Sequence, residues 1–404
     1  MPTMSPASTS TSPAAIVCSA LMTSASALLP LWNRGAEWER RLAMVRQSRS
    51  FLYLATFYIE HDAYGIGMLT ELNDAQRRGV AVNLLIDGFG QRLGGTLMSN
   101  ESRSALTSRL DALQRGGAVV TIYRPGHRLQ RWLGGGQHVK IQVSEAGEAL
   151  FCSSNVTRMS FEGWNEYAVA LRGPVVPTLL ESYREIGGSV EESHLDHLRT
   201  VAGSADGAIV LDYWLCNPNL LQGAAGPLGW KGTNVVTDRL VQMIAEAQSS
   251  IAITSLYFKP VEPLMVALVA AARRGVSVEI HHSHRDALPA TELAWIAAAA
   301  HYRRLLRAGV RVHENRHGEH SKLVVTDDSF VAFGSYNFEH AAHDRLAEAM
   351  LASRDPAAVR PALAIFEELR QHPDNVQVTS QTLRELPARL RIKRTILGPF
   401  KRWM

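Results

Sequence analysis

The alternation of apolar and polar residues predicts the same succession of elements twice along the chain. Residues 50–87 (SFLYLATFYIEHDAYGIGMLTELNDAQRRGVAVNLLID) and residues 250–283 (SIAITSLYFKPVEPLMVALVAAARRGVSVEIHHS) each start with a short apolar run of β type. A loop, an amphipathic helical pattern and a second apolar run follow. Both helical patterns end in Arg-Arg-Gly-Val, where Gly79 or Gly275 supplies the left-handed residue that commonly closes a helix. The sequence therefore predicts two strand-helix-strand units and an α/β fold with a largely parallel or mixed sheet in each half.

The second part of each half is also repeated. LQRGGAVVTIYRP (113–125) is followed by QHVKIQVSEAGEALFCSSN, and LLRAGVRVHENR (305–316) is followed by EHSKLVVTDDSFVAFGSYN. Residues two apart in a strand share a face, so each half is expected to present an imidazole beside an ammonium group. These pairs are His138 with Lys140 and His320 with Lys322.

Further polar residues keep the same spacing from the two histidines. Three pairs do so: Ser153 and Ser335, Asn155 and Asn337, and Glu166 and Glu348. Because the sequences between these positions diverge, the agreement indicates a duplicated site rather than chance.

The use of basic residues narrows the chemistry of this site. The chain has 42 lysines and arginines, of which only six are lysines, and two of these six stand in the paired positions. A compact ammonium group suits a crowded phosphate site. If the two halves meet about a pseudo-twofold axis, their His, Lys and Asn residues form a positively charged pocket that fits a phosphodiester.

Two histidines suit a two-step phosphoryl transfer. One imidazole can attack phosphorus, while the other protonates the departing alkoxide and then deprotonates the acceptor. The spacing leaves open which histidine is the nucleophile. Glu166 and Glu348 can accept the other ring N–H and so fix the tautomer; the alternative is that both are ordinary surface acids. This chemistry requires no cofactor, and the sequence clusters no ligand set for a metal.

The two segments resemble the His-x-Lys-x4-Asp motifs of the phospholipase D superfamily. HSKLVVTD with GSYN matches in full, whereas HVKIQVSE with CSSN is a variant, with Glu145 in place of Asp and Cys152 in place of Gly. FYIEHDAYGIGMLTEL, RRGVAVNLLID, WNEYAVALRGP, SLYFKP and HYRRLLRAGVRVHE are similar to the bacterial cardiolipin synthase branch, over about residues 32–370. The resemblance implies two phospholipase D-type α/β sandwich halves, related by a pseudo-twofold axis and sharing one active site.

The resemblance also implies a role for each matched residue. It implies a covalent phosphohistidine on His138 or His320, phosphate binding by Lys140, Lys322, Asn155 and Asn337, and orientation of the imidazoles by Glu166 and Glu348. Supporting positions would be Ser153, Ser335, Asp327 and Glu145, and we expect Asp327 to be a structural partner near its strand end. Many cardiolipin synthases carry Arg-Ser after the second motif, where this chain has Ala341-Ala342, and Leu346 replaces a common Asn. These departures leave the particular substrate open.

Composition shifts suggest how the chain is divided. We expect a disordered or low-complexity tail (1–34), a first phospholipase D-like domain (35–195), a connecting segment (196–232), a second such domain (233–380) and a basic amphipathic tail (381–404). The last segment mixes basic and apolar residues, which is typical of a membrane-surface segment. The alternative is a solvated basic tail or a nucleic-acid contact.

The whole chain has the composition of a soluble globular protein. It has 404 residues, of which 46% are hydrophobic and 20% charged, which excludes global disorder, collagen and a polytopic membrane protein. Three cysteines without a CxxC pattern argue against a disulfide framework and favour a reducing compartment. The formal net charge of +4 permits anionic partners without demanding them.

These observations predict a phosphatidyltransferase of the cardiolipin synthase type. Its substrate would be an anionic phospholipid, phosphatidylglycerol, and it would act as a peripheral protein on the cytoplasmic, inner face of the bacterial membrane. A phospholipase D that hydrolyses phospholipid is the alternative, because only the acceptor differs. A nucleic-acid phosphodiesterase is disfavoured by the 7% aromatic content and the terminal position of the basic cluster. The intact His-Lys-Asn sets disfavour a non-catalytic binding protein.

Overall fold

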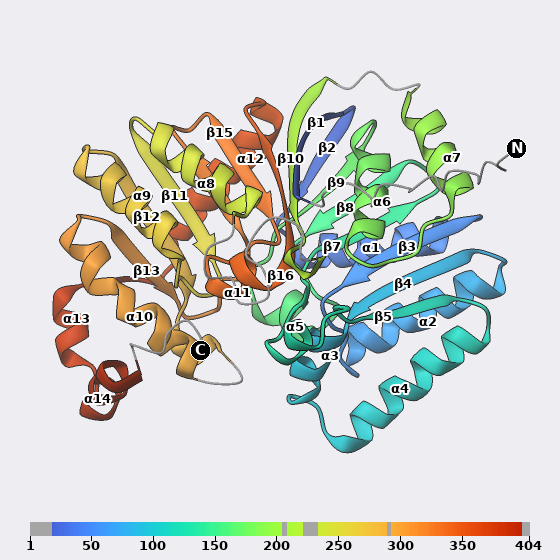
Figure 1. Cartoon of the computed structure of the whole chain (residues 1–404), viewed down its shortest axis with the longest axis horizontal. Coiled ribbons are helices and arrows are strands. Elements are labelled where there is room, and N and C mark those ends of the chain that lie inside the picture. The colour runs from blue at the N-terminus through green and yellow to red at the C-terminus, as the bar shows by residue number, and fades with distance from the viewer. Residues whose placement is uncertain (1–17, 204–207, 221–232, 289–291, 398–404) are drawn as a thin grey trace, which may run out of the picture.

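The computed structural model describes residues 18–203, 208–220, 233–288 and 292–397. The chain forms two halves, each a mixed β-sheet with helices, which pack against each other along the middle of the molecule (Figure 1). The expectation of a duplicated α/β architecture is therefore confirmed.

The first sheet has seven strands in the order β2-β9-β8-β7-β3-β4-β5. The strands are β2 (Ala27–Leu31), β3 (Phe51–Thr56), β4 (Ala81–Asp87), β5 (Val119–Tyr123), β7 (Lys140–Ser144), β8 (Glu148–Cys152) and β9 (Ala168–Arg172). The helices of this part are α1 (Arg34–Gln47), α2 (Ala63–Arg77), α3 (Gly88–Gly95), α4 (Asn100–Arg115), α5 (Arg128–Trp132), α6 (Val175–Glu185) and α7 (Glu192–Gly203), with a short π-helix at Met159–Gly163. Strands β3, β4 and β5 are parallel, and the others pair antiparallel.

The second sheet repeats this pattern and extends it at both edges, in the order β1-β10-β16-β15-β14-β11-β12-β13-β17. Its strands are β1 (Cys18–Ala25), β10 (Ile209–Cys216), β11 (Ser250–Ser255), β12 (Ser277–Ser283), β13 (Arg311–Asn315), β14 (Leu323–Thr326), β15 (Phe330–Gly334), β16 (Leu346–Ser353) and β17 (Asn375–Val378). Its helices are α8 (Val235–Glu246), α9 (Glu262–Arg273), α10 (Glu292–Arg307), α11 (His340–Asp344), α12 (Pro356–Gln371), α13 (Ser380–Glu385) and α14 (Ala388–Leu397), with 3-10 turns at Pro218–Leu220 and Arg285–Ala287. The two-residue strand β6 (Gly136–Gln137) comes from the first half but pairs with β16.

The predicted strand-helix-strand units are β3-α2-β4 and β11-α9-β12. In each, the two strands are parallel neighbours joined by the helix, which packs on the sheet. Gly79 and Gly275 follow the helices with φ of 91° and 95°, a conformation that side chains disfavour. The glycine signal in the sequence therefore marked both helix ends correctly.

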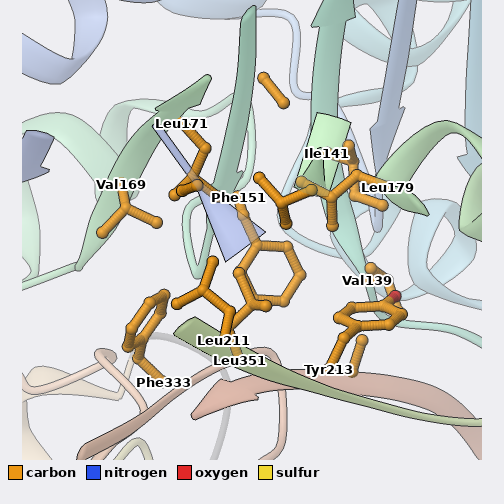
Figure 2. Packing of buried hydrophobic residues seen from close by; sticks show 14 of the residues in the cluster. Val139, Ile141, Phe151, Val169, Leu171, Leu179, Leu211, Tyr213, Phe333 and Leu351 are labelled. Carbon is orange, nitrogen blue, oxygen red and sulfur yellow. The ribbon is translucent and has the colours of Figure 1, made fainter. Parts of the chain in front are cut away.

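One apolar core joins the halves (Figure 2). Phe151 of β8 lies between strands of both sheets, with ring centroids 6.3 Å from Tyr213 of β10 and 6.4 Å from Phe333 of β15. Buried residues of α6 and α12 belong to the same cluster. Because the cluster is continuous, the two halves are fixed relative to each other, which a site built from both requires.

The amino-terminal segment differs from the disordered tail expected over residues 1–34. Residues 18–25 pair with β10 along the whole of β1, and residues 27–31 pair with β9. Main-chain hydrogen bonds hold such edge strands whatever their side chains, so a Ser- and Ala-rich composition was misleading here. Residues 1–17 of that expected tail lie outside the described residues.

The expected connecting segment 196–232 also contains regular structure. It includes the end of α7 and the whole of β10, which lies between β1 and β16 in the second sheet. Leu211, Tyr213 and Leu215 of β10 point into the shared core, so burial explains the strand. Residues 204–207 and 221–232 lie outside the described part, and the other domain boundaries stay predictions.

The carboxy-terminal segment is packed over its described part rather than detached. Helix α14 lies against α10, with Leu390 buried and Lys393 Nζ 3.1 Å from Glu292 Oε2. Ile392 and Ile396 are exposed. The membrane role of residues 381–404 stays a prediction, and residues 398–404 lie outside the described range.

Candidate active site

The two histidine loops cross from one half to the other. The main-chain N–H of His138 donates to the carbonyl of Ala347 in β16 at 2.8 Å, and that of His320 donates to the carbonyl of Asn165 at 2.8 Å. Each loop thus ends beside the strand or turn that carries the other half's glutamate. The two main-chain hydrogen bonds are equivalent, as expected when a pseudo-twofold axis relates the two halves.

The side chains follow the same crossed arrangement. His320 Nδ1 lies 2.7 Å from Glu166 Oε1, and His138 Nδ1 lies 3.1 Å from Glu348 Oε1. Each imidazole is therefore held by the glutamate of the other half, and neither half contains a complete site. Both carboxylates are fully buried, which rules out the reading of these residues as surface acids.

The serines before the asparagines complete each carboxylate's contacts. Ser153 Oγ donates to Glu166 Oε2 at 2.5 Å, and Ser335 Oγ donates to Glu348. Each serine Oγ also accepts the N–H of the residue after its glutamate, at 2.9 Å from Tyr167 and 3.0 Å from Ala349. The serines thus fix the orientation of the glutamates.

The hydrogen-bond partners decide the tautomer of both rings. His138 Nδ1 is 3.1 Å from the carbonyl oxygen of Ser335, which can only accept, so Nδ1 carries the hydrogen in the neutral ring. Nδ1 of His320 faces the Glu166 carboxylate, which accepts in the same way. Nε2 of each neutral imidazole therefore carries a lone pair that can attack phosphorus or accept a proton.

Burial sets the charge state of the histidines. It lowers the pKa of His320 to about 4, against the opposing effect of Glu166. Burial and the nearby ammonium of Lys140 hold the pKa of His138 well below its ordinary value, and Lys322 and His320 add to this. Without an anion in the site, both imidazoles are neutral at pH 7, and a bound phosphate would favour protonation.

The two carboxylates differ in their protonation. Burial would raise the pKa of Glu166, but His320, Lys322 and Ser153 outweigh it and hold the pKa at about 2. The pKa of Glu348 is raised well above its ordinary value because burial prevails there. The two halves are thus similar in geometry but not in electrostatics.

The paired lysines are as buried as the histidines. Lys140 Nζ donates to the carbonyl of its own His138 at 2.7 Å, and Lys322 does the same with His320. Burial and repulsion by Lys322 lower the pKa of Lys140 to about 7, and burial lowers the pKa of Lys322 to about 8. The effect of Lys322 on the pKa of Lys140 indicates that the two ammonium groups lie close enough to share one site.

The asparagines also belong to the buried site. Asn155 and Asn337 are 2% and 3% exposed. Neither Oδ1 atom has a hydrogen-bond partner among the described residues. An amide oxygen accepts hydrogen bonds, so a hydroxyl group of a ligand could bond to each Oδ1, whereas each Nδ2 could donate to a phosphate oxygen.

Two aromatic contacts to the histidines were not predicted. Trp164 stacks on His320 with ring centroids 4.8 Å apart, and Phe57 meets His138 edge to face at 4.7 Å. Phe57 also lies under Lys140 Nζ, 5.6 Å from the ring centroid. A signal for both residues was available in the sequence, because Trp164 begins WNEYAVALRGP and Phe57 begins FYIEHDAYGIGMLTEL, two segments that are similar to the cardiolipin synthase branch.

The last residue of each motif lies away from the histidines. Asp327, in the β14–β15 hairpin, accepts the N–H groups of Gln248, Ser249 and Ser250 at 2.7–3.1 Å. Glu145 accepts one equivalent bond, from the N–H of Arg49 at 2.7 Å. Both carboxylates therefore hold main-chain N–H groups at a strand end, which agrees with the structural role expected for Asp327. Glu145 has the same kind of contact but fewer hydrogen bonds.

The first motif has Cys152 where the second has Gly334, and the space around these two positions differs. Gly334 ends β15, and a Cβ there would lie 2.2 Å from the carbonyl oxygen of Ala349. Cys152 ends β8 at the equivalent position, and its Sγ contacts Arg41 Nη2 at 2.6 Å. The first half therefore has room at this point that the second half lacks.

Two of the three positions that depart from the cardiolipin synthase pattern, Ala341 and Leu346, belong to an apolar wall. Leu346 packs with Phe57 and Tyr58 in a small buried cluster, and Ala341 lies against it. Since Phe57 also contacts His138, this wall lies beside the candidate site. The sequence shows these replacements, but only the structure places two of them at this wall.

The described residues contain neither a metal-binding cluster nor a membrane-spanning helix. No group of three or more His, Cys, Asp or Glu side chains there is arranged to hold a metal ion. No helix within the described ranges has the length and hydropathy needed to cross a bilayer.

Comparison with known proteins agrees with this geometry. The family model described as "Cardiolipin synthase, PLD-like domain" matches residues 42–186 and 240–370. Cardiolipin synthase B of Salmonella typhimurium is 24% identical over 311 residues, 73% of this chain and 68% of that protein. Cardiolipin synthase A of Pseudomonas aeruginosa is 26% identical over 348 residues, 83% of this chain and 65% of that protein, so the chain spans about two thirds of both relatives.

Among solved structures, phosphatidylserine synthase from Haemophilus influenzae superposes with a TM-score of 0.70. It is 15% identical, and the match covers 95% of this chain and 96% of that one, which shows a shared fold. The family match falls on both halves and includes the two histidine motifs. The chain therefore belongs to the cardiolipin synthase family of phospholipase D-like proteins.

Proposed function

We propose that this protein is a phosphatidyltransferase of the cardiolipin synthase type. It would transfer the phosphatidyl group of one phosphatidylglycerol to a hydroxyl of a second and release glycerol. The observation that carries the proposal is the crossed pairing of His138 with Glu348 and of His320 with Glu166. It gives one buried site two imidazoles in the same tautomer, which a double displacement requires.

In the first step, Nε2 of one histidine attacks phosphorus and the P–O bond to the departing glycerol breaks. The other histidine, protonated once the anionic phosphate is bound, gives its proton to the glycerol oxygen. A covalent phosphohistidine remains.

In the second step, the histidine that lost its proton takes one from the acceptor hydroxyl. The hydroxyl oxygen attacks phosphorus, the P–N bond breaks, and the phosphodiester product leaves. Lys140, Lys322, Asn155 and Asn337 would bind the non-bridging oxygens through both steps, and Glu166 and Glu348 would orient the rings. The nucleophile is one of the two histidines.

Hydrolysis of the same intermediate is the second candidate. Water in place of a lipid hydroxyl would give phosphatidic acid, as in a phospholipase D. The apolar wall of Phe57, Tyr58 and Leu346 beside His138 favours transfer, because apolar side chains at a site exclude water. We further propose that the protein works as a peripheral protein on the cytoplasmic face of the membrane that holds its substrate.

The test is incubation of the purified protein with phosphatidylglycerol in mixed micelles, with products resolved by mass. His138→Ala and His320→Ala should each abolish turnover, and His372→Ala, at the end of α12, is the matched control. Cardiolipin and glycerol support the proposal if both site variants lack them. Phosphatidic acid without cardiolipin would establish the hydrolase instead, and near-normal turnover by His320→Ala would refute the two-histidine chemistry.

A further inference from the structure

An exposed tryptophan lies close to the candidate site. Trp132, the last residue of α5, is 81% exposed, the highest value among the large apolar side chains in the described part of the chain. Such extensive exposure of a tryptophan is costly in water, and tryptophan concentrates at membrane–water interfaces. The residue therefore needs an explanation other than packing.

The segment that carries Trp132 is anchored on both sides of this residue. Gln130 is buried and donates through Nε2 to the carbonyl of Pro218 at 2.9 Å. The carbonyl of Leu133 accepts from Arg345 Nη1 at 2.9 Å. Because its neighbours are fixed to the protein, the Trp132 side chain is held outward, and the same segment continues directly into His138.

Helix α3 lies beside this segment (Figure 1) and contacts β6, its continuation. Gly134 lies against the Phe89 ring, since a Cβ on that glycine would be 3.0 Å from it. Leu93 follows Phe89 by four residues and shares its face of α3, and Leu97 lies in the turn directly after this helix. They are 48% and 42% exposed. We call Trp132, Leu93 and Leu97 the apolar rim.

Exposed arginines lie on the same two segments as the apolar rim. Arg92, Arg124, Arg128 and Arg131 are exposed, and none of them forms an ion pair with a described residue. The two stretches that carry them contain no Asp or Glu between Asp87 and Glu101 or between Asp111 and Glu145. An unbalanced positive surface around exposed apolar side chains complements an anionic lipid surface.

We propose that the apolar rim and its arginines form the surface that docks on an anionic phospholipid bilayer. Trp132, Leu93 and Leu97 enter the boundary between headgroups and acyl chains, and the arginines contact the headgroup phosphates. This inference rests on the proposed function, because docking here would bring the segment leading to His138 next to its lipid substrate. It is independent of the carboxy-terminal helix α14.

The test is co-sedimentation of the full-length protein with vesicles of phosphatidylglycerol and phosphatidylcholine, compared with vesicles of phosphatidylcholine alone. Trp132→Ala should weaken binding to the anionic vesicles by about tenfold, and the double variant Arg128→Glu/Arg131→Glu should weaken it by more than about tenfold. Met22→Ala in β1 and Arg360→Glu in α12 are matched controls from another part of the surface (Figure 1). Thermal melting of each variant checks that it is folded.

Tryptophan fluorescence gives a second measurement. The difference between the spectra of the wild type and of Trp132→Phe isolates the emission of Trp132, which should shift to the blue on addition of anionic vesicles. Binding of folded Trp132→Ala and Arg128→Glu/Arg131→Glu at the wild-type level would overturn the inference. The inference would also be overturned if the wild type did not bind anionic vesicles, or if binding were lost only on deletion of residues 384–404.

Vesicle binding needs no turnover, so the two proposals fail separately. Loss of binding in the variants of a protein that makes no cardiolipin would refute the proposed function and leave the docking surface standing. If the wild type makes cardiolipin but the variants bind vesicles normally, the docking surface is refuted and the proposed function stands.

Discussion

The crossed pairing makes Glu166→Gln an informative substitution. Glutamine keeps the size of the side chain but removes the negative charge that His320 Nδ1 meets at 2.7 Å. A hydrogen bond to a charged group contributes about 1.5–3 kcal/mol. At about 1.4 kcal/mol per tenfold in rate, we expect kcat to fall by roughly 10- to 150-fold.

Glu348→Gln should cost less, for two reasons in the structure. His138 Nδ1 keeps its 3.1 Å contact with the carbonyl of Ser335 when the carboxylate is gone. The pKa of Glu348 is already raised well above its ordinary value by burial, so the substitution removes less charge. We therefore predict that kcat falls further in Glu166→Gln than in Glu348→Gln.

Two measurements test this reasoning. Turnover of phosphatidylglycerol gives kcat, with Glu162→Gln as the control, because that carboxylate is exposed and next to the same segment. Nuclear magnetic resonance of ¹⁵N-labelled histidine follows each ring, assigned with His138→Gln and His320→Gln. Glu166→Gln should lower the pKa of His320 below its value of about 4, because in the wild type the Glu166 carboxylate favours the protonated ring.

The refuting outcomes are specific. If Glu166→Gln moves the resonances of His138 and leaves those of His320 unchanged, each glutamate serves its own half and the crossed pairing is wrong. A kcat equal to that of Glu162→Gln would show that the charge at Glu166 has no part in the reaction.

Three further predictions follow from the geometry. The kcat/KM for phosphatidylglycerol should fall as pH rises, because Lys140 and Lys322, with pKa values of about 7 and about 8, lose the charge that would bind phosphate; a flat profile from pH 6 to 9 would contradict this. Asp327→Ala should lower the free energy of unfolding by about 1–3 kcal/mol while kcat of the folded protein stays unchanged, since three main-chain N–H groups lose their acceptor; denaturant unfolding and steady-state kinetics check both parts. Gly334→Ala should lower the free energy of unfolding by about 1–3 kcal/mol, because its Cβ would meet the carbonyl oxygen of Ala349; denaturant unfolding of Gly334→Ala with the stability of the wild type would show that the end of β15 has room for a side chain.

Local signals in the sequence accounted for much of the fold. Apolar runs, helical periodicity and the Arg-Arg-Gly-Val ends predicted β3-α2-β4 and β11-α9-β12, because these features depend on residues close together in the chain. The same composition rules were wrong for β1 and β2 and overlooked β10. Edge strands are held by main-chain bonds to partners far away in sequence, and composition does not report such partners.

For the candidate site, the sequence by itself determined which residues belong together. The common spacing selected His138, Lys140, Asn155 and Glu166 and their four counterparts, and the structure buries all eight side chains. Spacing within one half cannot tell whether a glutamate serves its own histidine or that of the other half, because the numbers are the same in both cases. Only the tertiary structure decided this: the shared core brings the halves together, and the loops before β7 and β14 cross the boundary, so that each imidazole meets the carboxylate of the other half.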